Sequence, residues 1–261
     1  GRVDDEDPRF FNFNRHLLLV PEHTWGMDEK TFLGDHENYS RERFNAIRNF
    51  PAFKIFESSW VEKRGNIQRA VQALADSPLA EEAANRLRAL GPLKPDLSTW
   101  NRIDQEVFCI ENEFLSAGFS CASPTLRSLQ SVRTGRVWAD RQHPLAEFSY
   151  QTFSAVDYER FFDQYIINKY QNGEWPREDF CKPGLELANP PSRTWEAIPM
   201  AWFERKTESS HEILSCLTFD KEALSQFGAP GEATLLYSFP NDAPEIHLEL
   251  QWFKKPACRM P

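Results

Sequence analysis

The sequence predicts an α+β protein with a helical amino-terminal part and an antiparallel β-sandwich in the carboxy-terminal part. Two observations support this prediction. Apolar residues recur at helical spacing between residues 38 and 90, whereas the later part of the chain has short apolar or alternating runs separated by turn residues. The segment Pro92-Leu93-Lys94-Pro95 separates the two patterns, because proline interrupts regular structure. We therefore expect two domains, over residues 1–95 and 96–261.

The helical pattern predicts three helices that form one packing unit. Pro51 separates a short first helix from a second one over residues 53–75, in which apolar side chains form a stripe. Ser77 is a typical helix cap and predicts the start of the third helix, which ends before Gly91. Because the connections are short, neighbouring helices are expected to run antiparallel.

The second domain is expected to consist of short strands with one helical insertion. The predicted strands cover residues 106–111, 129–133, 136–139, 146–153, 197–205, 212–219, 234–239 and 245–253. In the last strand Ile246, Leu248, Leu250 and Trp252 alternate with polar residues, which predicts one buried face. The insertion is a helix over residues 156–170. Its apolar side consists of Tyr158, Phe161, Phe162, Tyr165 and Ile166.

Composition limits the classes of partner. Lys and Arg number 30 against 39 Asp and Glu, and the net charge of −9 disfavours nucleic acid and anionic membranes. No apolar run approaches the roughly 20 residues that a membrane-spanning helix requires. The five cysteines are widely spaced and form no C-x-x-C pair, so no zinc cluster is predicted. The sequence is compatible with a soluble protein in an extracellular or a cytoplasmic location.

Common catalytic motifs are missing from the sequence. It contains no G-x-S-x-G string of a serine hydrolase, no phosphate-binding P-loop, no dinucleotide-binding glycine string and no H-E-x-x-H zinc motif. The 39 carboxylates do not by themselves indicate the pair that a glycosidase places across its cleft. No cofactor and no metal site are predicted from the residues.

The string P-E-H-T-W-G-M-D at residues 21–28 is the strongest local candidate for a site. It follows the apolar run Leu18-Leu19-Val20, which we expect to be a buried entry strand that delivers polar groups at its end. Glu22 and His23 could orient a substrate hydroxyl, and Trp25 could stack on a sugar ring. The alternative is structural: Glu22 and His23 form a hydrogen-bonded pair and Trp25 anchors the loop.

Further candidate ligand-binding residues lie in both predicted domains. Glu57, Trp60 and Arg64 fall at i, i+3 and i+7 on one face of the second helix, which would place a carboxylate and a guanidinium beside an indole. Trp138 and Asp140 lie where a predicted strand leads into a loop. The structural alternatives are a helix-to-sandwich salt bridge for the helical residues, and a core Trp with a turn-capping Asp for the other two.

Six strings that occur in order along the chain resemble one protein family. They are E-H-T-W-G at residues 22–26, D-H-E-N-Y at 35–39, E-S-S-W-V-E-K-R at 57–64, G-R-V-W-A-D at 135–140, Y-Q-T-F at 150–153 and K-P-A-C-R-M-P at 255–261. Together they resemble a family of large proteins related to glycoside hydrolase family 38, the α-mannosidase-like enzymes. The resemblance implies a helical bundle followed by large β-sandwich domains.

The catalytic residues that this resemblance implies are not found in the chain. Such enzymes carry their divalent metal site and nucleophile in an amino-terminal barrel, with a His-x-Asp pair on an early strand. None of the six histidines stands two residues before an Asp, and only twenty residues precede Pro21, against roughly 250 for a barrel. We therefore expect an internal or carboxy-terminal piece of a longer protein, without catalysis of its own.

The residues and the resemblance together predict carbohydrate recognition. The expected partners are carbohydrate and the amino-terminal barrel of a longer chain. One alternative is a free-standing lectin-like protein, and a second is a glycosidase that uses Glu22, His23 and Asp28 as its acid–base set. Exposed aromatic rings in a flat row, or a pocket with Trp25 at its mouth, would favour sugar binding; uniformly buried aromatic rings would favour a scaffold.

Overall fold

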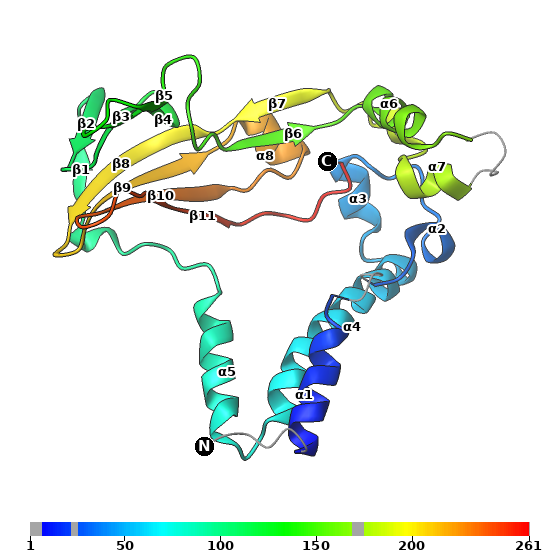
Figure 1. Ribbon diagram of the computed structural model, residues 1–261. Coiled ribbons are helices and arrows are strands. Elements are labelled where there is room, and N and C mark those ends of the chain that lie inside the picture. Colours follow the sequence, from blue (N-terminus) through cyan, green and yellow to red (C-terminus); the bar gives the residue numbers. More distant parts are fainter. Residues whose placement is uncertain (1–6, 22–25, 169–174, 261) are drawn as a thin grey trace. The chain divides into compact units, whose positions relative to one another are not determined.

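The computed structural model describes residues 7–21, 26–168 and 175–260. A series of helices precedes a set of antiparallel sheets, so the predicted α+β class is confirmed (Figure 1). The chain contains two compact units. Unit 1 comprises residues 1–91 and 155–189, and unit 2 comprises residues 92–154 and 190–261.

Residues 155–189 interrupt the strands in sequence but belong to the helical unit. The predicted division placed them in the second domain. The Tyr39 hydroxyl donates a hydrogen bond to the carbonyl oxygen of Pro183 at 3.0 Å, and Lys30 forms an ion pair with Asp179. These contacts join segments that are well over a hundred residues apart, and sequence periodicity cannot indicate pairing at that distance.

The first helix of unit 1, α1 (Pro8–Leu18), replaces the predicted entry strand, which is wrong. The Asp7 side chain accepts a backbone N–H of the first turn and Pro8 follows it, so the helix begins well before the apolar run. Phe10 and Phe13 are half-buried and lie one helical turn apart. Leu18 and Leu19 are exposed at the end of an amphipathic helix.

The three predicted helices of residues 38–90 are confirmed. They are α3 (Arg41–Ile47), α4 (Pro51–Ala73) and α5 (Pro78–Ala89), preceded by the short helix α2 (Glu29–Phe32). The Ser77 hydroxyl caps α5 by accepting the amide of Leu79 at 3.1 Å, as expected. The long helix α4 packs against α1, and α5 contributes no buried residue. The core of these helices consists of Tyr39, Phe44, Phe53, Phe56 and Ala70.

The predicted helical insertion is confirmed and contains two helices. These are α6 (Ala155–Tyr165) and α7 (Trp175–Phe180), followed by the short 3-10 helix η2 (Leu185–Leu187). Helix α6 ends earlier than predicted, at Tyr165. Phe162 of α6 and Leu185 of η2 are buried, so the insertion has buried apolar residues both before and after α7 in the sequence.

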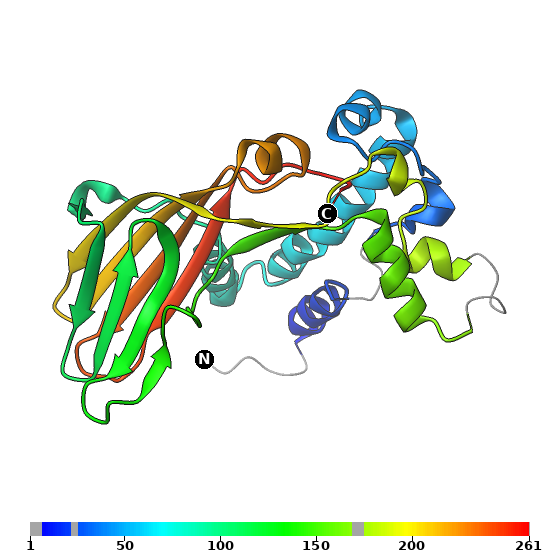
Figure 2. The same ribbon diagram turned by 90° about the horizontal axis from the view of Figure 1, so that it is seen from above.

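Unit 2 is built from three antiparallel sheets. A short 3-10 helix, η1 (Leu97–Thr99), precedes them. The five-stranded sheet has the order β1 (Asn101–Ile103), β8 (Ile198–Lys206), β9 (Ser210–Thr218), β10 (Glu232–Pro240) and β11 (His247–Phe253). The four-stranded sheet has the order β2 (Val107–Glu111), β3 (Leu115–Ser120), β4 (Ser123–Ser131) and β5 (Val137–Ala139), and it lies across one face of the first sheet (Figure 2). A smaller sheet pairs β6 (Ser149–Thr152) with β7 (Arg193–Glu196), and α8 (Lys221–Gln226) follows β9.

Aromatic side chains fill the space between the two larger sheets. The Phe119 ring on β3 lies 5.8 Å from the Trp202 ring on β8 and 5.1 Å from the Tyr237 ring on β10. The Tyr237 hydroxyl donates to the carbonyl oxygen of Pro124 at 2.7 Å, and burial raises the pKa of this phenol. The predicted sandwich is confirmed by these contacts.

The last strand, β11, has the predicted alternation but not the predicted burial. Leu248 and Trp252 lie opposite Tyr237 and Ala233 of β10, which are buried. However, Leu248 and Trp252 are each about half exposed, at 53% and 50%. The prediction of a fully buried face is wrong because β11 is an edge strand, with a neighbour on one side only.

Candidate functional site

Three of the predicted site residues lie outside the described part of the chain: Glu22, His23 and Trp25. The residues that follow them are fixed to α4. Gly26 has a φ of 90° and packs so closely that a Cβ atom there would lie 2.5 Å from Cδ1 of Trp60. The amide of Met27 donates to the Ser59 hydroxyl at 3.0 Å. Trp60, a predicted ligand-binding residue, therefore holds the loop that leaves the candidate string.

Asp28 begins α2 and is held as a carboxylate. It accepts the Thr31 amide at 3.0 Å as the helix cap and the Lys30 ammonium at 2.8 Å. The hydrogen bond from Lys30 is the main reason why the pKa of Asp28 is lowered. The same ammonium binds Asp179 of α7, and the two carboxylates, Asp179 first, raise the pKa of Lys30 to about 12. At neutral pH Asp28 and Lys30 are charged, so Asp28 can accept hydrogen bonds but cannot donate a proton.

Helix α7 connects this loop to α6 through three consecutive residues. Glu178 lies 3.8 Å from Nε2 of His36, Asp179 binds Lys30, and the Phe180 ring lies 4.8 Å from the Tyr165 ring of α6. His36 Nδ1 is buried and has no hydrogen-bond partner among the described residues. Three consecutive residues of α7 therefore contact three different segments of unit 1.

We define the aromatic platform as Phe161, Tyr165 and Phe180. The Phe161 and Tyr165 rings are nearly parallel, with an interplanar angle of 17° and centroids 5.5 Å apart. Phe161 is 47% exposed and Tyr165 is 58% exposed. The sequence suggested that both residues belong to the apolar side of a packed helix, and it missed this surface. The sequence feature that could have indicated this surface is the i, i+4 spacing of Phe161 and Tyr165, which brings two rings together on a helix.

The predicted group of Glu57, Trp60 and Arg64 does not form one cluster. Glu57 binds the guanidinium of Arg48 at the corner between α3 and α4, with distances of 2.5 and 3.2 Å. Trp60 packs edge-on against Phe56, with ring centroids 5.5 Å apart. Arg64 is exposed. Glu57 therefore stabilises a helix corner, and Trp60 packs against Gly26 of the candidate string.

Trp138 and Asp140 belong to unit 2, at the end of β5. Asp140 accepts the backbone amides of Gln142 at 2.8 Å and of His143 at 2.9 Å, and these bonds lower its pKa. This is the turn-capping role that was the structural alternative for Asp140. Trp138 is 41% exposed, with the Arg136 guanidinium 5.7 Å from its ring centroid, so it is not the core Trp of that alternative.

A match to a protein family covers almost the whole chain. The model of a domain of unknown function, DUF5054, matches residues 1–247. The chain belongs to this family. No curated protein and no solved structure matches it. The description of DUF5054 states no activity, so a function has to be argued from the residues of the site.

Two properties of the described residues in this DUF5054 chain concern metal ions and membranes. Among the described residues, no three or more His, Cys, Asp or Glu side chains form a group that could hold a metal ion. No helix in the described ranges has the length and apolarity needed to cross a membrane. The described part of unit 1 offers aromatic faces, carboxylates and the imidazoles of His16 and His36, which are groups suited to binding polar ligands that also have an apolar face.

Proposed function

We propose that the chain recognises carbohydrate, without catalysis of its own, through a surface of unit 1 that combines the aromatic platform with the carboxylates of α7. The observation that supports this most directly is the pair of exposed, nearly parallel rings of Phe161 and Tyr165. Sugar rings present apolar C–H faces that pack on aromatic faces. Rigid aromatic side chains supply contact area at low entropic cost.

Polar groups on α7, the helix that carries Phe180 of the platform, suit the hydroxyls of a sugar. Glu178 and Asp179 directly precede Phe180 in α7 and are partly exposed. Ionised carboxylates accept hydrogen bonds at several positions, and Lys30 keeps Asp179 in place while its remaining lone pairs stay available. A binding site of this kind uses the aromatic face for affinity and the carboxylates for orientation.

The resemblance of the sequence to α-mannosidase-like proteins supports the same class of ligand. The loop after the E-H-T-W-G string reaches α7 through Lys30 and Asp179, so the string and the platform belong to the same unit. In this proposal the chain is the carbohydrate-recognising part of a glycoside hydrolase family 38-like protein. The barrel of a longer chain would supply the metal and the chemistry.

The test is a glycan array on the purified chain, followed by calorimetry with the glycans that bind. Mannose-containing oligosaccharides are the first choice because of the resemblance. Phe161→Ala with Tyr165→Ala is expected to weaken binding by about thirtyfold, since ring contacts of this kind contribute on the order of 1 kcal/mol each. Trp138→Ala, an exposed aromatic residue of unit 2, is the matched control and should leave binding unchanged.

Each result has a defined meaning. If no glycan binds, the proposed function is wrong. If glycans bind equally well to the double variant, the platform is not the site, and Trp25→Ala then tests the candidate string. Loss of binding in Trp138→Ala alone would place the site in unit 2.

A further inference from the structure

A groove of about 440 Å³ lies on the outer face of the five-stranded sheet in unit 2. Its floor includes Cys216 and Thr234, which lie opposite each other and point away from the sandwich, since their neighbours along both strands are buried. Glu232 and Phe253 lie opposite each other further along. Met200 of β8 and Leu97 of the segment before β1 add apolar surface. The lining is largely apolar, which is unusual for the solvent side of a sheet.

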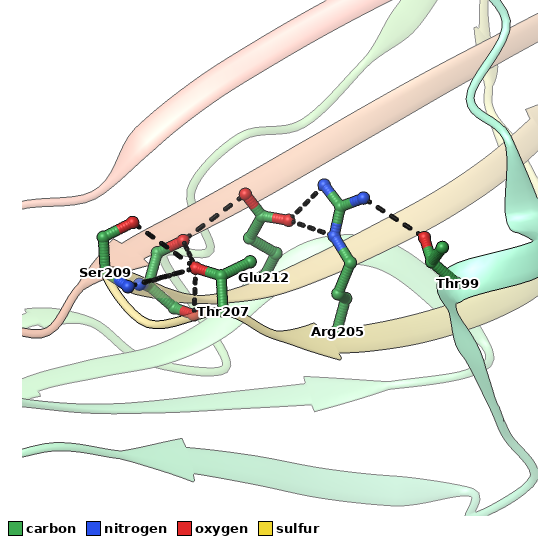
Figure 3. A network of polar contacts seen from close by, with 6 residues as sticks. Thr99, Arg205, Thr207, Ser209 and Glu212 are labelled. Carbon is green, nitrogen blue, oxygen red and sulfur yellow. Dashed lines mark hydrogen bonds and ion pairs between the residues drawn. The ribbon is translucent and has the colours of Figure 1, made fainter.

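The segment that begins unit 2 borders the groove and is attached to the sheet at several points. The Leu93 amide donates to Oε1 of Gln251 at 2.7 Å, and Lys94 forms an ion pair with Glu232. Further along, the Thr99 hydroxyl lies 3.4 Å from Arg205, which also binds Glu212 at 2.6 Å (Figure 3). These attachments fix one wall of the groove.

Two ammonium groups share one carboxylate at the edge of the groove: Lys94 lines the groove, and Lys254 directly follows the lining residue Phe253. The ammonium groups of Lys94 and Lys254 both bind the single carboxylate of Glu232, and hydrogen bonds from these lysines lower its pKa. Among the described residues that line the groove, Glu232 is the one acidic side chain. Lys94 also lies 5.6 Å from the centroid of the Phe253 ring, so the cation is at the apolar surface.

We propose that this groove binds a free amphipathic carboxylate, with the apolar body of the ligand on Met200, Cys216 and Phe253 and its anionic end at Lys94 and Lys254. The volume lies within the range of small-molecule sites, roughly 300–1,000 Å³. The apolar lining favours a hydrocarbon or aromatic body, and two ammonium groups that share one carboxylate favour an anionic end over a neutral one. The groove lies in unit 2, so this inference does not rest on the proposed carbohydrate function.

Cys216 provides a direct reporter of occupancy because it lines the groove. Burial raises the pKa of its thiol, so alkylation is carried out at mildly alkaline pH. The reduced chain is titrated with octanoate, decanoate and dodecanoate below their micelle concentrations. The rate at which N-ethylmaleimide modifies each cysteine is followed by peptide mass spectrometry. Decanoate is expected to slow modification of Cys216 several-fold and to leave exposed Cys109 unchanged.

Ligands of different chain length test the apolar contact. Variants that remove a charge or fill the groove test the anionic contact and the position of the site. Affinity should rise roughly tenfold for each two added methylene groups until the groove is filled. Lys94→Gln should weaken decanoate binding about fivefold, whereas Lys206→Gln, an exposed lysine on β8, should not. Thr234→Phe, placed opposite Cys216, should abolish protection while the strand content measured by circular dichroism is retained.

The proposal is overturned by any of three results. Equal slowing at Cys109 and Cys216 would indicate a detergent-like effect. No slowing of Cys216 modification at the solubility limit would show that the groove does not bind the ligand. Equal affinity for decan-1-ol and decanoate would remove the role of Lys94 and Lys254 and leave only an apolar surface.

Discussion

The carbonyl oxygen of His36 fills the space that a side chain at Gly184 would need. A Cβ atom at Gly184 would lie 1.8 Å from that oxygen, and the φ of Gly184 is 82°, a conformation that favours glycine. The close approach seats the end of the insertion on the loop between α2 and α3. Because η2 starts directly after Gly184, this contact also sets where the insertion turns back.

Gly184→Ala is expected to destabilise unit 1 strongly. The left-handed conformation costs a non-glycine residue about 1–2 kcal/mol, and the clash with His36 adds to that cost. Gly34→Ala is the matched control, because Gly34 also has a positive φ, 57°, but its nearest neighbouring atom would be 3.9 Å away. Urea unfolding followed by far-ultraviolet circular dichroism measures both variants. Equal losses would show that strain alone, and not the contact with His36, determines the effect.

The stability of unit 1 should depend on the charge of Asp28 at acid pH. Its pKa is lowered in the folded chain, so the ionised carboxylate stabilises the fold above its usual pKa of 3.8. This stabilisation is lost as the pH falls below that value towards the lowered pKa. Asp28→Asn keeps an oxygen that can cap α2 but carries no charge. Between about pH 5 and pH 2 the wild type should lose more stability than the variant; parallel urea midpoints would contradict this account.

Replacing each of two adjacent phenylalanines of α6 by alanine should change stability by very different amounts. Phe162 is 4% exposed, so Phe162→Ala should cost about 3–5 kcal/mol by leaving a cavity. Phe161 is 47% exposed, and Phe161→Ala should change stability by less than about 1 kcal/mol. Chemical unfolding of the two variants checks this. A large loss in Phe161→Ala would mean that the platform is part of the core and that the binding test above needs a milder substitution, Phe161→Leu.

Two buried tryptophans of unit 2 should differ when each is replaced by phenylalanine. Nε1 of Trp195 donates to the Thr152 hydroxyl at 3.0 Å, whereas Nε1 of Trp202 is buried without a hydrogen-bond partner among the described residues. Trp195→Phe removes a satisfied bond, and Trp202→Phe removes an unsatisfied donor. We expect Trp195→Phe to be the more destabilising by about 1 kcal/mol. An equal or larger loss in Trp202→Phe, measured by thermal unfolding, would argue against this difference.

Local patterns in the sequence predicted much of the fold. The apolar stripe of α4, the cap at Ser77 and the alternation along β11 each depend on neighbouring residues only, so they could be read directly. The apolar run at the end of α1 could not, because a short run fits a strand or a helix and the cap at Asp7 decided the outcome. Strand β3 was missed because its small residues, such as Gly118, show no periodicity.

The candidate site was less predictable because its contacts come from distant segments. The partner of Glu57 is Arg48 at the end of α3, whereas helical spacing indicated only that Glu57 shares a face of α4 with Trp60 and Arg64. The sequence placed Phe161 and Tyr165 on an apolar helix side, and only the packing of the neighbouring helices leaves them exposed. Residue spacing along a helix shows which side chains share a face, but not what covers that face.

The insertion also affects the order in which the chain can fold during synthesis. The ends of β6 and β7 are paired, with Thr152 opposite Arg193, so the inserted segment leaves and re-enters unit 2 at neighbouring points. Unit 1 lacks α6, α7 and η2 until residue 189 has been made, roughly a hundred residues after its first part ends at residue 91. At about 5–20 residues per second, the ribosome would hold an incomplete helical unit for several seconds or longer. During that interval the contacts of Tyr39 with Pro183 and of Lys30 with Asp179 cannot form.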